Sequence, residues 1–84
     1  MRIKVSVSQD NIDDGWSGCY SCPVALAIKG IDESYHPWVV STRIMIYLNG
    51  SRVSIDTPRS VNRFVRRFDS RKPVKPFNFF LEIP

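Results

Sequence analysis

Cys19 and Cys22 are the residues of this chain whose type and spacing first suggest chemistry. A Cys-x-x-Cys pair occurs in thiol–disulfide sites and in zinc sites. In thiol–disulfide sites the first cysteine lies at a helix N-terminus, where the backbone amides lower its pKa. Here Cys22 lies at the predicted helix start and Cys19 falls in a glycine-containing loop. The pair therefore favours a structural role, whether or not the two thiols form a disulfide, and a thiol oxidoreductase is the least favoured alternative.

No other group of reactive residues has the number and spacing that a catalytic or metal site needs. His36 is the single histidine, so the cysteine pair lacks the four ligands of a zinc site and no spacing makes His36 a base for a cysteine nucleophile. The acidic pairs Asp13–Asp14 and Asp32–Glu33 fall in predicted loops, where solvated carboxylates are common. The sequence therefore predicts no catalytic residue, no metal site and no cofactor, and it predicts a protein that is not an enzyme.

Cations form the second group of candidate residues. Twelve Lys and Arg stand against eight Asp and Glu, a net charge of +4 that favours anionic partners. One candidate surface is a helix face, and the planar guanidinium of arginine suits phosphate and carboxylate groups. Its residues are Arg59, Arg63, Arg66 and Arg67, continued by Arg71, Lys72 and Lys75. The other candidate is an exposed sheet face with Arg2, Lys4, Arg43, Tyr47 and Arg52.

The elements that must position these residues follow from hydrophobic periodicity. Residues Met1–Ser8 alternate as a strand does, and Gln9–Gly18 reads as a loop, with a helix inside Gln9–Asp14 as the alternative. Pro23 suits the first position of a short helix that Gly30 closes. Residues Trp38–Leu48 predict one strand.

The second half of the chain begins with a hairpin. Asn49-Gly50 is the strongest short hairpin signal and leads into a strand over Ser51–Asp56. Thr57-Pro58 then opens a helix by the same capping arrangement as the first one. Its apolar residues recur at helical spacing, at Val61, Phe64, Val65 and Phe68. A last strand covers Phe77–Ile83.

The resulting order is β-α-β-β-α-β in a single α+β domain over residues 1–84. The simplest packing is the ferredoxin-like (split βαβ) plan, a four-stranded antiparallel sheet with two helices on one face, and another α+β arrangement is the alternative. Right-handed crossovers would place the first and third strands at the centre. The exposed sheet face would carry Met45, Tyr47 and Phe80, which suit a homodimer interface.

Several function classes are disfavoured by pattern. RNA-recognition domains share this topology, but they stack bases on aromatics of the two central strands, and none is expected there. No apolar run approaches the roughly 20 residues of a membrane helix. Two cysteines are too few for a secreted disulfide framework. We therefore expect a soluble, cytoplasmic protein without membrane contact, and nucleic-acid binding stays an alternative function.

Blocks of the sequence resemble a family of short bacteriophage and prophage proteins. The blocks are Met1–Ser6, Cys22–Ala27 (CPVALA), Phe64–Asp69 (FVRRFD) and Pro73–Phe79 (PVKPFNF). The resemblance brings no catalytic residue with it. It implies a small non-virion protein in the host cytoplasm that binds and blocks a host factor, with host defence systems among the targets. With the cations, it predicts a binding protein for an acidic host protein or an anionic nucleotide signal.

Overall fold

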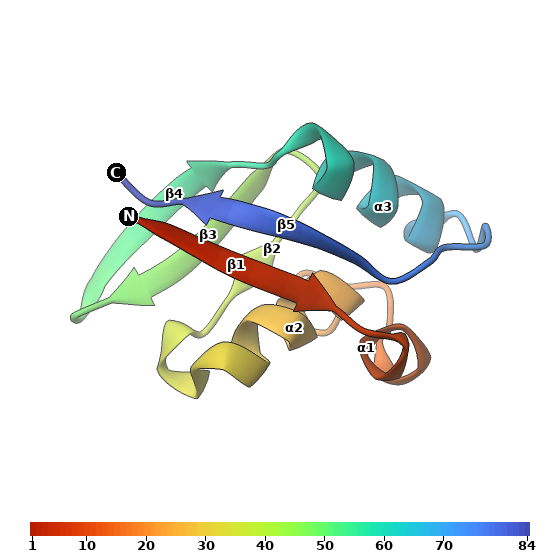
Figure 1. The fold of residues 1–84 in the computed structure, drawn as a ribbon, viewed down its shortest axis with the longest axis horizontal. Helices are drawn as coiled ribbons and strands as arrows, with labels where there is room; N and C mark the ends of the chain where they lie inside the picture. Colours follow the sequence, from red (N-terminus) through yellow and green to blue (C-terminus); the bar gives the residue numbers. More distant parts are fainter.

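Five strands, three α-helices and a short 3-10 helix follow one another along residues 1–84, all of which the computed structural model describes (Figure 1). They are β1 (Arg2–Val7), α1 (Gln9–Asp14), α2 (Pro23–Ile31), η1 (Glu33–Tyr35), β2 (Trp38–Val39), β3 (Arg43–Leu48), β4 (Ser51–Asp56), α3 (Arg59–Asp69) and β5 (Phe77–Glu82). The predicted α+β class is confirmed. The hairpin at Asn49-Gly50 is confirmed as well, with φ of 51° and 80° at its two residues.

The strands form two antiparallel sheets. In one, β1 pairs with β5 over its whole length, from Arg2 opposite Glu82 to Val7 opposite Phe77. The other has the order β2-β3-β4. The single four-stranded sheet of the ferredoxin-like plan is not what the strands form, because β1 has β5 as its only neighbour and does not pair with β4.

The two sheets share one hydrophobic core. Seventeen buried apolar residues form one cluster that takes the inward faces of both sheets, for example Val5 and Leu81 from the first and Ile44 and Ile46 from the second. The sheets thus bury their inner faces in a common core, where each large side chain contributes about 1.5–3 kcal/mol. In Figure 1, α2 lies below β1 and α3 lies above β5, so the two helices flank the two-stranded sheet at opposite edges in this view.

One segment differs from the prediction, and another decides between two predicted alternatives. The predicted strand Trp38–Leu48 is divided, because a turn in which the Val40 N–H donates to the Arg43 carbonyl, at 2.9 Å, folds β2 back onto β3. The helical alternative for Gln9–Asp14 is confirmed as α1. Its N-terminus is a capping box in which Asn11 N–H donates to Ser8 Oγ (3.1 Å) and Ser8 N–H donates to Asn11 Oδ1 (2.9 Å).

The starts of α2 and α3 are built differently. The Cys22 sulfur accepts the Ala25 N–H at 3.4 Å and caps α2, which continues past the predicted end at Gly30 to Ile31. At α3 the predicted capping by Thr57 is wrong: no side chain caps this helix, and the Thr57 hydroxyl donates to the Val40 carbonyl at 3.2 Å. The apolar stripe of α3 is confirmed, with Val61, Phe64 and Val65 buried.

Candidate binding surface

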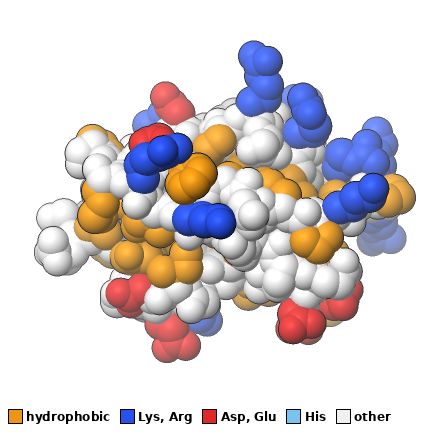
Figure 2. Space-filling model, viewed as in Figure 1, with side chains coloured by type: hydrophobic (Ala, Val, Ile, Leu, Met, Phe, Trp, Pro, Cys, Tyr) orange, Lys and Arg blue, Asp and Glu red, His pale blue; other side chains and the backbone are white.

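Most cations of the chain gather on α3 and the segment after it. We call this set the basic surface: Arg59, Arg63, Arg66, Arg67, Arg71, Lys72 and Lys75. All seven are exposed, and none forms an ion pair. Figure 2 shows cations gathered at the upper right of the view, around α3 and the segment after it, whereas acidic side chains lie along the lower edge and at the upper left. Unpaired, exposed cations keep their full field available to a partner.

The charge is distributed unevenly along the chain. Residues 59–84 hold seven of the twelve cations and two of the eight acids, a net charge of +5, whereas residues 1–58 have a net charge of −1. This segregation is larger than the overall +4 suggests. An anionic partner is therefore steered toward α3 during its approach.

The predicted sheet surface is divided between the two sheets. Arg2 and Lys4 lie on β1, whereas Arg43, Tyr47 and Arg52 lie on β3 and β4. These residues therefore come from two sheets rather than from one continuous sheet. The expected homodimer face is divided in the same way, with Phe80 on β5 and both Met45 and Tyr47 on β3.

The sheet cations are also partly neutralised. Arg2 Nε is 2.8 Å from a Glu82 carboxylate oxygen, and its guanidinium lies 4.1 Å from the centre of the Phe80 ring. Arg43 pairs with Asp56 across β3 and β4. Lys4 and Arg52 remain as exposed cations without an ion pair. The sheets thus offer an anionic partner much less free charge than the basic surface does.

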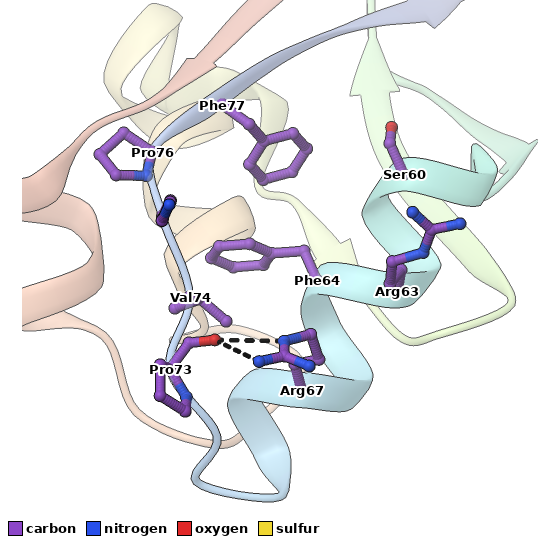
Figure 3. Close-up of a pocket in the computed structure, with 9 residues that line it drawn as sticks. Ser60, Arg63, Phe64, Arg67, Pro73, Val74, Pro76 and Phe77 are labelled. Atoms are coloured by element: carbon purple, nitrogen blue, oxygen red, sulfur yellow. Dashed lines mark hydrogen bonds between the residues drawn. The ribbon is translucent and has the colours of Figure 1, made fainter.

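A groove lies within the basic surface, between α3 and the segment Pro73–Pro76 (Figure 3). We call it the α3 groove; its volume is about 460 Å³. Apolar side chains line its interior: Phe64 from α3, Val74 from the segment and Phe77 from β5. Its other lining residues are Ser60, Arg63, Arg67, Pro73, Lys75 and Pro76. The groove therefore combines apolar walls with cationic borders.

The chain reversal after α3 builds this groove. The Lys72 N–H donates to the Arg67 carbonyl at 2.9 Å, and Arg71 takes a left-handed conformation with φ 60°, which turns the chain back along the helix. Arg67 then holds the returning segment, because its Nε and one terminal nitrogen both donate to the Pro73 carbonyl, at 3.1 and 2.9 Å (Figure 3). The proline at position 73 fixes φ in this stretch.

Trp16 is an exposed residue that no sequence motif marks as functional. Its side chain is 76% exposed, and it lines a second groove with Phe68, Arg71 and Lys72 on the other side of Pro73–Val74. The loop that carries it is ordered by the Trp16 N–H, which donates to the Ser21 carbonyl at 2.9 Å. A large apolar side chain held in solvent beside cations is typical of an interface anchor. Its place in a polar loop, outside any apolar periodicity, was the available signal.

The cysteines have the structural character that the sequence favours. Both are free, and Cys22 is 2% exposed. Burial raises the pKa of the Cys22 thiol, outweighing the backbone hydrogen bonds from Ala25 and Val24, which lower it. A nucleophilic thiolate requires the opposite shift. No group of three or more His, Cys, Asp or Glu side chains is arranged to hold a metal ion.

Comparison with known proteins adds no relative to this description. Neither protein-family models, nor curated proteins, nor solved structures give a match to the chain. None of its helices has the length and apolar character needed to span a membrane. The arrangement of the residues themselves is therefore the basis for a functional proposal.

Proposed function

We propose that this chain is a small phage-encoded binding protein without enzymatic activity. It acts in the host cytoplasm and antagonises a host factor, a component of a defence system among the candidates, by contacting an acidic protein surface with its basic surface. The observation that carries the binding mode is the set of seven exposed cations on α3 and residues 70–75, none of which has an acidic partner within the chain. The resemblance of the sequence blocks supports the phage setting.

The α3 groove supports a protein as the partner in preference to an anionic nucleotide or a nucleic acid. A nucleobase binds by stacking on a free aromatic face. Within the groove Phe64 and Phe77 pack against each other with ring centroids 4.8 Å apart, and Phe64 is only 6% exposed. Apolar walls beside cations suit the mixture of apolar side chains and carboxylates on a protein surface.

Charge-reversed variants test this proposal. The double variant Arg63→Glu/Arg66→Glu changes the basic surface, and Lys4→Glu/Arg52→Glu makes the same change in net charge on the sheets. Tagged proteins would be used to capture partners from phage-infected cells, and the affinity for a recovered host protein would be measured. We expect at least a tenfold loss of affinity, about 1.4 kcal/mol, for the first variant and little change for the second.

Two results would contradict the proposal. Equal losses in both variants would show that net charge matters and that the basic surface does not. The other is recovery of nucleic acid, with affinity that falls steeply with salt as condensed counterions are released from phosphates. That result would favour the alternative of a nucleic-acid-binding accessory protein, for which exposed Trp16 beside Arg71 and Lys72 is the supporting observation.

A further inference from the structure

We infer that the α3 groove is a preformed pocket for one large apolar side chain from an acidic segment of the partner. This inference depends on the proposed function and specifies its ligand: a short peptide stretch with a Phe or Leu anchor and carboxylates on either side of the anchor. The occupant follows from the apolar interior of the groove and from the charge at its borders.

The interior of the groove matches an apolar side chain. Phe64 is nearly buried, whereas Val74 and Phe77 are half-buried and keep part of their surface open to the groove. The volume of about 460 Å³ lies within the range of 300–1,000 Å³ typical of ligand sites. Transfer of an apolar side chain from water to these walls is favourable by roughly 25 cal/mol for each Å² that is buried.

The borders of the groove match carboxylates. Arg63 lies on the α3 side and Lys75 on the side of the returning segment, and both are exposed without an ion pair. In an extended peptide, side chains two positions apart point to the same side and are about 7 Å apart. Carboxylates two residues before and two residues after the anchor would therefore face these cations. The preferred ligand is acid-x-anchor-x-acid.

The groove is held open in the absence of a ligand. Two hydrogen bonds from Arg67 to the Pro73 carbonyl fix the returning segment to α3, and this use of the guanidinium leaves it less able to bind a phosphate group bidentately. Pro73 and Pro76 also lack the backbone N–H groups that bind phosphates in many nucleotide sites. Preorganisation lowers the cost of ordering an interface, which favours recognition of a short segment.

Three fluorescein-labelled eleven-residue peptides test the inference by fluorescence anisotropy. The first has a central Phe with Glu at the second position on each side, the second replaces the Phe by Ala, and the third replaces each Glu by Gln. We expect the first peptide to bind at least tenfold more tightly than the second, and the third to bind most weakly. The ranking should hold at a fixed salt concentration of 0.05 M, where screening is weak.

Substitutions at Ser60 identify the groove as the site. Ser60 lies at the border of the groove on the first turn of α3 and is exposed, so Ser60→Tyr can fill the space without disturbing the core. It should reduce binding of the Phe peptide to the level of the Ala peptide. Ser51→Tyr, at an exposed position on β4, is the matched control and should change nothing. Ser60→Glu is a second variant, and it should stabilise α3 because an acid in the first turn complements the helix dipole. Its negative charge should repel both acidic peptides.

The outcomes separate the two proposals. Equal binding of the Phe and Ala peptides, or Phe-peptide binding that Ser60→Tyr leaves unchanged, would overturn the pocket and leave the acidic partner intact. Failure of both acidic peptides to bind at millimolar concentration would overturn the proposed function and this inference with it. Displacement of the peptides by a twelve-nucleotide single strand of deoxythymidines at lower concentration would assign the surface to nucleic acid and overturn both.

Discussion

At the scale of single residues, Cys22 both caps α2 and packs in the hydrophobic core. Its sulfur accepts the Ala25 N–H while its side chain is almost fully buried, so replacement has two costs. Cys22→Ala removes the cap and leaves a small void, and we expect it to lower the free energy of unfolding by about 1–2 kcal/mol. Cys22→Ser keeps an acceptor for the cap and should cost less than Cys22→Ala. Urea denaturation measures both, with the half-buried Cys19→Ala as the control that should stay within about 0.5 kcal/mol.

The same thiol makes stability depend on pH. Because burial raises the pKa of Cys22 above its ordinary value of 9.0, the thiol ionises in the unfolded chain before it ionises in the folded protein. Its contribution to stability is therefore complete below pH 9 and is lost as the pH rises through the folded-state pKa. Cys22→Ser should show a smaller loss of stability above pH 9 than the natural chain. Parallel curves for the two proteins would contradict this assignment.

At the scale of elements, three glycines should respond differently to alanine. At Gly15, which directly follows α1, an added Cβ would lie 2.7 Å from the Pro23 ring and 2.8 Å from the Asn11 carbonyl oxygen, so Gly15→Ala should cost about 2–3 kcal/mol. Gly50→Ala has space but keeps φ at 80°, with an expected cost of about 1 kcal/mol. At Gly30 in α2, an added Cβ would meet no atom within 4 Å beyond its chain neighbours and the backbone of its own helix, so Gly30→Ala should stabilise by about 0.5–1 kcal/mol.

Thermal unfolding of the three glycine variants gives the test. Each kcal/mol corresponds to about 4–8 °C in a domain of this size, so the three shifts can be resolved. A smaller loss for Gly15→Ala than for Gly50→Ala would show that α1 can move away from α2 at little cost. Alanine is favoured over glycine in a regular helix. A loss of stability in Gly30→Ala would therefore show that the backbone at Gly30 is not regular helix in the last turn of α2.

The elements also show how far sequence patterns determine this fold. The alternation of Val5 and Val7 and the helical spacing of Val61, Phe64 and Val65 predict the inward faces correctly, because burial follows the period of each element. The fold-back of β2 onto β3 has no such signal, since the turn at residues 40–42 contains neither glycine nor proline. The division into two sheets depends on how the buried faces pack together, which periodicity along one strand does not specify.

The sequence predicts one part of the candidate site, the exposed arginines, but not the other part, the α3 groove. The four arginines of α3 follow from helical spacing, because residues outside the apolar stripe must face solvent. The α3 groove does not, since it depends on the chain reversal at Arg71 and on the hydrogen bonds from Arg67 to Pro73. The prediction placed Arg2, Lys4, Arg43, Tyr47 and Arg52 on one sheet, whereas the strands that carry them belong to two sheets.

At the scale of the whole molecule, the basic surface and Trp16 lie at the same end of a body that measures 35 × 22 × 19 Å. The α3 groove and the Trp16 groove share Pro73 and Val74, so one partner can cover both. Charge then brings the partner to this end of the molecule, and apolar contacts on both sides of Pro73–Val74 hold it there. A partner protein should therefore lose affinity when either contact is removed.

Trp16 offers a direct optical test of this arrangement. The chain has two tryptophans, and Trp38 is half-buried, so a Trp38→Phe variant leaves Trp16 as the only tryptophan of this chain. We expect its emission to move to shorter wavelength when the captured host protein binds, because the indole leaves water for an apolar contact. Trp16→Ala should weaken that binding at least tenfold and leave the unfolding midpoint unchanged, since the side chain is 76% exposed. Quenching without a wavelength shift on adding single-stranded DNA would instead indicate stacking on bases. An emission maximum that stays constant with the host protein bound would place the interface away from Trp16 and restrict it to the α3 side of Pro73–Val74.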